Sequence, residues 1–200
     1  LLANPDVFLR HGLWEGNASN DDTEDIALLA AVLRTGWNPQ VVEELSRKDR
    51  AQLPVVLIRH RDEAGIEGLL LGFWSGRLLG DLQQFESFLS RPLYYGTLDG
   101  EENAKLSMLH AYPEMPGAIR LDEGLGISYD YLQACDWVGP EGPGSSLRFK
   151  FFYGHMSWSA SEAKRELSAK TGIWIPLRAS ADLLLREPDS SFEEPLWVQL

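Results

Sequence analysis

The chain has 200 residues, of which 44% are hydrophobic and 24% are charged, so it is long enough to bury one core without disulfides or a structural metal. Its formal net charge is −12. That charge repels phosphate backbones, and we expect no nucleic-acid partner.

The single cysteine, Cys135, excludes an intrachain disulfide and fits a reducing compartment. The longest unbroken apolar run is residues 26–33. A transmembrane helix needs roughly 20 such residues, so we expect no transmembrane segment. The chain begins with Leu1, and we expect an upstream segment that is either a targeting peptide or a first strand.

The first 52 residues predict two helices after a short apolar opening. Residues 23–35 carry acids in the first turn and apolar residues at helical spacing, with Gly36 as the stop. Asn38 then caps a second helix, with Pro39 at its first position.

The centre of the chain predicts short strands separated by turns. Residues 53–59 and 68–74 are rich in β-formers around a turn, which indicates a hairpin. Residues 81–90 have the spacing of an amphipathic helix, and residues 129–137 indicate another. Further strands are expected at 93–95, 106–112, 118–121, 125–127 and 147–153. Ser159 and Glu162 then form a capping box, which predicts a helix start. Hairpins mixed with separate helices indicate an α+β fold.

Several segments, in this order along the chain, resemble the AlgH-like family. The pattern is a strand ending in a glycine, a step containing tryptophan, a capped helix and a closing tryptophan. The matching residues are Leu109-His110, Phe151-Phe152-Tyr153-Gly154, Ser157-Trp158-Ser159, Glu166-Leu167 and Trp174. The resemblance implies a single domain over residues 1–200, with a mixed, mostly antiparallel sheet curled into a pseudo-barrel and flanked by helices. It implies a helical insertion at about residues 10–52, and it carries over no established catalytic activity.

The chain departs from the bacterial pattern in its loops. Gly72-Phe73-Trp74 stands where bacterial members have Asn-Arg-Pro, and Ser157-Trp158 stands where they have Gly-Trp. These changes make a small-anion site in those loops less favoured. The extended, divergent sequence resembles family members of photosynthetic eukaryotes, which implies a chloroplast location in the stroma or on the stromal face of the thylakoid; a cytoplasmic location is the alternative.

The candidate ligand site is the junction after residue 153, which we expect to connect a strand to a helix. Free N–H groups at a helix start can bind an anion. The candidate residues are Tyr153, Gly154, His155, Ser157 and Trp158, together with His110. The competing interpretation is a packed tryptophan at the junction, a hydrogen-bonded strand histidine at His110 and a loop residue at His155. The histidine and cysteine spacings match no metal motif, so neither a metal nor another cofactor is expected.

Aromatic residues in or near loops are the candidate interface, since exposed aromatics are enriched where proteins meet. They are Trp14, Trp37, Phe73 and Trp74; the competing interpretation places most of these aromatics in the core. Two hypotheses follow. The first is a non-enzymatic accessory or scaffold protein, a soluble peripheral subunit or assembly factor of a membrane-embedded photosynthetic complex of the thylakoid. The second is a small-ligand-binding regulator or enzyme that uses the junction. Aromatics exposed on one face would favour the first, and convergence of His110 with His155 would favour the second.

Overall fold

The computed structural model describes residues 2–3, 55–82, 86–97, 105–167, 174–187 and 196. The helices expected at residues 23–35 and after Asn38, the insertion at about 10–52, and both Trp14 and Trp37 lie outside these ranges. No described helix is long and apolar enough to cross a membrane.

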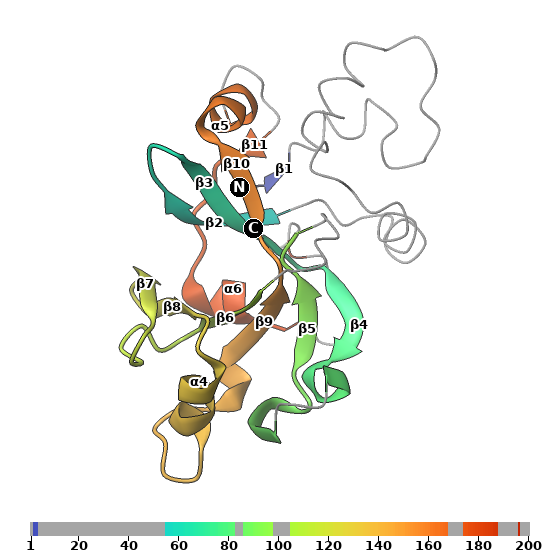
Figure 1. Ribbon diagram of the computed structural model, residues 1–200, viewed down its shortest axis with the longest axis vertical. Helices are drawn as coiled ribbons and strands as arrows, with labels where there is room; N and C mark the ends of the chain where they lie inside the picture. The colour runs from blue at the N-terminus through green and yellow to red at the C-terminus, as the bar shows by residue number, and fades with distance from the viewer. Residues whose placement is uncertain are drawn as a thin grey trace.

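The described strands form two sheets (Figure 1). The five-stranded sheet has the order β10 (Met156–Ser159), β3 (Gly65–Leu71), β2 (Val55–Arg61), β1 (Leu2–Ala3), β11 (Trp174–Ile175). The six-stranded sheet has the order β4 (Trp74–Leu78), β5 (Pro92–Tyr95), β9 (Phe149–Tyr153), β6 (Leu106–His110), β8 (Leu125–Ser128), β7 (Ile119–Asp122). Among these strands only β5 and β9 pair in parallel. The α+β class and the mostly antiparallel pairing are confirmed, with two sheets in place of one curled sheet.

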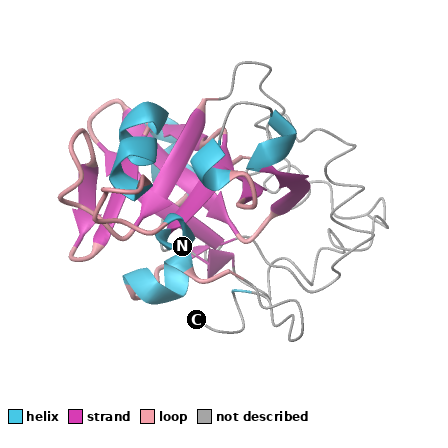
Figure 2. Ribbon diagram, turned by 90° about the horizontal axis from the view of Figure 1, so that it is seen from below, coloured by secondary structure: helices cyan, strands magenta, loops and turns pink. Residues whose placement is uncertain are grey.

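Short helices lie around the strands (Figure 2). They are the 3-10 helices η1 (Leu79–Leu82), η2 (Glu86–Phe88) and η3 (Ser146–Arg148) and the α-helices α4 (Tyr131–Val138), α5 (Ala160–Glu166) and α6 (Ala181–Leu185). The prediction of one amphipathic helix at residues 81–90 is wrong, because the 3-10 helices η1 and η2 occupy parts of that range. The capping box expected at the start of α5 is confirmed, with both of its hydrogen bonds present.

Three glycines form the corner where the two sheets meet. Gly72 and Gly154 have φ of 86° and 77°, values that favour glycine, and at each of them the chain leaves one sheet for the other. Between them Gly96 bridges the sheets, since its carbonyl accepts from Leu70 N at 2.9 Å and its own N–H donates to Tyr153 O at 2.9 Å. The strand expected at residues 68–74 therefore ends at Leu71, because the turn at Gly72 redirects the chain.

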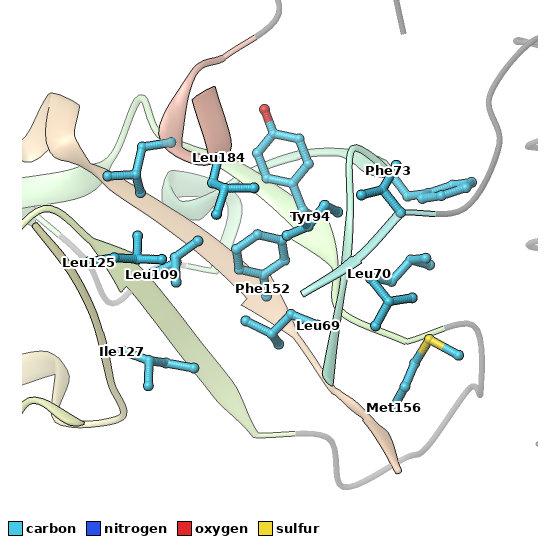
Figure 3. Packing of buried hydrophobic residues seen from close by; sticks show 14 of the residues in the cluster. Leu69, Leu70, Phe73, Tyr94, Leu109, Leu125, Ile127, Phe152, Met156 and Leu184 are labelled. Atoms are coloured by element: carbon cyan, nitrogen blue, oxygen red, sulfur yellow. The ribbon is translucent and has the colours of Figure 1, made fainter. Parts of the chain in front are cut away.

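Each face of the six-stranded sheet covers a separate core. Cross-strand partners share a face, so Tyr94, Phe152 and Leu109 point together toward the five-stranded sheet and α6 (Figure 3). The opposite face packs against η1, η2 and α4. Its buried residues are Leu79, Phe88, Leu93, Met108, Met115, Ala134, Phe149 and Phe151. The six-stranded sheet is thus buried on both sides along its central strands.

Candidate functional site

The segment from Tyr153 to Trp158 connects two strands. β9 ends at Tyr153, the chain turns at Gly154, and β10 begins at Met156 and pairs with β3. The expected direct strand-to-helix junction is therefore wrong, because β10 intervenes and α5 begins only at Ala160. Within β10 the side chains alternate, with Trp158 buried and Ser157 exposed.

Trp158 is fixed by packing and by one buried hydrogen bond. Its side chain is 4% exposed, and its ring packs against the Gly68 position of β3, where a Cβ would lie 3.4 Å away, an ordinary contact distance. The indole Nε1 donates to Glu166 Oε2 at 2.9 Å. Arg165 also donates to Glu166, at 2.9 Å. These contacts support the packed-tryptophan interpretation of this residue.

The start of α5 is already occupied by its own side chains. Glu162 accepts from the backbone N–H of Ser159 at 2.8 Å and from its hydroxyl at 2.7 Å. These hydrogen bonds stabilise the charged form and lower the pKa of the Glu162 carboxyl. The helix start therefore presents a carboxylate where an anion would have to bind, and an anion is disfavoured there.

His110 lies inside the core, away from this segment. It is fully buried, its Nδ1 accepts from Tyr112 N at 3.3 Å, and burial lowers its pKa to about 4. In the pairing of β6 with β9, His110 of β6 lies opposite Phe149, and Leu106 of β6 lies opposite Tyr153. Phe149 and Tyr153 are thus about 13 Å apart along β9, at roughly 3.3 Å per residue.

His155 is on the other side of the turn after β9, next to the five-stranded sheet. Its Nε2 lies 4.0 Å from Glu67 Oε1, and Glu67 also pairs with Arg59 at 2.8 Å. The two candidate histidines therefore do not converge. In the described ranges no three His, Cys, Asp or Glu side chains gather closely enough to hold a metal ion.

Three cations hold the segment that contains α6; Lys150 lies on β9, and Arg91 and Arg148 directly precede β5 and β9. Lys150 is 2% exposed, and its Nζ donates to Arg186 O at 3.2 Å and to Leu184 O at 3.5 Å. The buried Arg91 pairs with Glu187, which follows α6. At the other end of the helix, Arg148 pairs with Asp182 at 2.8 Å. We refer to residues 177–187, held in this way, as the C-terminal strap.

Sequence reasoning missed this arrangement, although one signal was present. A lysine inside the apolar run Phe149-Lys150-Phe151-Phe152 must be buried with partners if the run is a strand. Burial lowers the pKa of Lys150 to about 8. Its ammonium also lies 4.6 Å from the centroid of the Tyr94 ring, a cation–π contact. The described contacts of Lys150 are thus structural, since they fasten the strap to the sheet.

The candidate interface aromatics differ in exposure. Phe73 is 3% exposed and belongs to the core, so its expected place on the surface is wrong; the turn at Gly72 directs it inward. Trp74 is 56% exposed on the outermost strand β4. Its Nε1 donates to Arg77 O at 3.2 Å, which orients the indole on the surface.

A cavity of about 200 Å³ opens between the two sheets at the other end of the larger core. Its walls come from β2, the turn between β7 and β8, and the C-terminal strap. The described residues that line the cavity are mainly apolar. They are Val55, Val56, Leu57, Ile58, Leu71, Leu121, Asp122, Leu125, Leu177, Arg178, Ala179 and Leu184. No residue of the Tyr153–Trp158 segment is among these.

With this geometry established, comparison with known proteins identifies the family. The model of the AlgH-like family matches residues 35–199. The chain belongs to the AlgH-like family. This match reaches back into the interval where a helical insertion was expected.

Individual AlgH-like relatives are distant in sequence. A UPF0301 protein of Bacteroides fragilis is 25% identical over 134 residues, 66% of this chain and 66% of the relative. One from Bacteroides thetaiotaomicron is 27% identical over 122 residues, 60% of this chain and 59% of the relative. The chain thus spans less than two thirds of the length of either relative. The solution structure of the AlgH protein from Pseudomonas aeruginosa has a TM-score of 0.52 at 16% identity, covering 66% of this chain and 71% of that one, which is a likeness of fold.

Proposed function

We propose that the protein is a non-enzymatic accessory or scaffold protein that acts through protein–protein contacts. The observation that carries the proposal is Trp74, a large aromatic side chain exposed on an outermost strand and oriented by its own hydrogen bond. Tryptophan is over-represented among the residues that dominate binding energy at protein interfaces. An ordered side chain also loses little conformational entropy when a partner covers it.

Two further exposed leucines lie on β4 and next to its end. Trp74 and Leu78 lie opposite Tyr94 and Pro92 on β5, so they share one face of the sheet. Leu89 is 50% exposed and packs beside Gly80, two residues beyond Leu78. We refer to Trp74, Leu78 and Leu89 as the β4 apolar edge. Exposed apolar groups of this kind beside an outermost strand favour a protein partner.

The more specific part of the proposal is a place in the chloroplast, as a peripheral subunit or assembly factor of a photosynthetic complex of the thylakoid. Its support is the resemblance of the divergent sequence to family members of photosynthetic eukaryotes. The alternative, a regulator or enzyme built on the Tyr153–Trp158 segment, loses support because His110 and His155 lie apart and Trp158 is buried.

Replacement of Trp74 tests the proposal. A tagged full-length chain and its Trp74→Ala variant are expressed in the native source, and each is followed on a native density gradient. We expect the wild type to sediment with a large complex and the variant to shift to light fractions. The matched control is Leu132→Ala on α4, where the parent side chain is 75% exposed but lies outside the β4 apolar edge. Equal sedimentation of Trp74→Ala and wild type would remove the support that Trp74 gives.

A further inference from the structure

The C-terminal strap is fastened to the six-stranded sheet by side chains. Its described attachments are two buried leucines, two ion pairs and the hydrogen bonds of one lysine. They involve Leu184 and Leu185 of the strap, and Arg91, Arg148 and Lys150 opposite it. None of the strand pairings among the described residues includes the strap. The strap can therefore leave the sheet without breaking any of these ladders.

The helix in the strap depends on the sheet for its stability. α6 spans five residues, Ala181–Leu185, whereas isolated helices shorter than about 12 residues are marginal in water. Its hydrogen bonds and its contacts with the sheet are therefore made and lost together. Short segments held in this way open locally at a lower free energy than the whole chain unfolds.

Closure of the strap buries more positive than negative charge. Lys150 and Arg91 are 2% and 4% exposed, and Glu187 is the carboxylate that the described part of the chain sets against them. The Nε of Arg91 is also buried without a hydrogen-bond partner among the described residues. Burial of a charge that is incompletely paired is unfavourable, and water returns to both cations when the strap leaves. The closed form therefore carries an electrostatic cost that the open form lacks.

Lys150 is the group that can remove this cost. An arginine keeps its proton, whereas a buried lysine can lose one. The described charged or titratable neighbours of the ammonium are Arg91 and Tyr94 on the β5 side and Glu187 on the strap. Burial raises the pKa of the Tyr94 phenol, so this neighbour stays uncharged. On β6, Leu109 lies opposite Lys150. Loss of the lysine proton thus leaves one cation and one carboxylate beneath the strap.

We propose that the C-terminal strap is a releasable clasp, which detaches from the sheet as a unit and takes up a solvent proton on Lys150 as it opens. A fall in pH therefore favours the open strap. Opening uncovers part of the larger core, to which Leu184, Tyr94 and Phe152 belong (Figure 3). The inference goes beyond the proposed function, since it concerns the strap and not the β4 apolar edge.

The size of the effect follows from proton linkage. The pKa of Lys150 is about 8 in the closed form against 10.5 for an unperturbed lysine, so the open form binds the proton more tightly. Between pH 7 and pH 9 the opening constant should fall about tenfold.

Hydrogen exchange of the full chain measures this opening. The amides of Leu184 and Arg186 donate to Ser180 O and Leu183 O at 3.2 and 3.3 Å, so they are protected only while the strap is closed. Each exchange rate is measured with millisecond mixing at pH 7 and pH 9 and divided by the rate of an unstructured peptide at the same pH. We expect weaker protection in the strap than in β9 at both values, and an approximately tenfold rise in the strap from pH 7 to pH 9.

Two lysine variants separate the role of Lys150 from a general effect of charge. Lys150→Met should lose the rise with pH, and Lys164→Met, which removes an exposed lysine of α5, should keep it. If Lys150→Met does not fold, Glu187→Gln serves instead, and we expect it to weaken the protection of the strap at least tenfold at pH 7. Equal protection of the strap and β9, or protection of the strap that does not change with pH, would overturn the proposal.

Discussion

The indole Nε1 of Trp158 donates to the carboxylate of Glu166 across 2.9 Å, inside the protein. This bond joins β10, an outer strand of the five-stranded sheet, to the last residue of α5. Glu166 is 2% exposed and also accepts from Arg165, so its charge is matched by a cation. Trp158 and Glu166 therefore fasten the helix to the sheet.

Removal of this acceptor should destabilise the fold. A buried donor left without its partner costs about 1–3 kcal/mol. We expect Glu166→Ala to lower the free energy of unfolding by at least this amount, measured by urea denaturation. Glu166→Gln retains an acceptor oxygen for the indole and should lose less. Equal losses in the two variants would show that the hydrogen bond to Trp158 contributes little.

The buried Lys150 predicts a gain in stability at alkaline pH. Its pKa is about 8 in the folded chain against 10.5 for an unperturbed lysine, so between these values the unfolded chain binds the extra proton. Stability must then rise with pH across this window. Relative to Lys150→Met, the wild type should gain roughly 3 kcal/mol between pH 8 and pH 10.5. A difference independent of pH would contradict the burial of this ammonium beside Arg91 and Tyr94.

His110 predicts a loss in stability at acid pH. Burial lowers its pKa to about 4 from 6.5, so the unfolded chain takes up a proton first as the pH falls. The wild type should lose up to about 3 kcal/mol relative to His110→Leu between pH 6.5 and pH 4. Urea denaturation of both proteins across this range measures it. A titration of His110 by NMR with a midpoint near 6.5 would place the residue in contact with solvent instead.

The glycine corner predicts different costs for two alanine substitutions. In Gly96→Ala the new Cβ would lie 2.2 Å from Gly154 O, so the backbone must move. Gly124 has φ of 72° and nothing within 4 Å of its Cβ position, so Gly124→Ala carries only the left-handed strain of about 1–2 kcal/mol. We expect Gly96→Ala to lower the melting temperature more than Gly124→Ala does. The reverse order would contradict the close contact of the sheets at this corner.

Features set by neighbouring residues were predictable from the sequence, and features set by distant contacts were not. The capping box joins Ser159 to Glu162, three positions further along the chain, and it forms as expected. β10 has its own signal in the alternation of apolar and polar residues in Met156-Ser157-Trp158-Ser159, although the sequence pattern predicts a step before a helix there.

The C-terminal strap depends on partners far apart in the chain. Arg91 and Glu187 are 96 residues apart, and no spacing rule joins them. The sequence likewise places Phe73 and Trp74 side by side without indicating that one is buried and the other exposed. That difference follows from the turn at Gly72 and the packing of two sheets, which are properties of the whole fold.

We propose that this protein acts by binding a protein partner. The most direct test of this is the size of the untagged protein in a gently solubilised extract of its native source, measured on a native gel with an antibody. We expect migration with an assembly much larger than the 22.5 kDa chain. Migration as a free monomer at native abundance would contradict it.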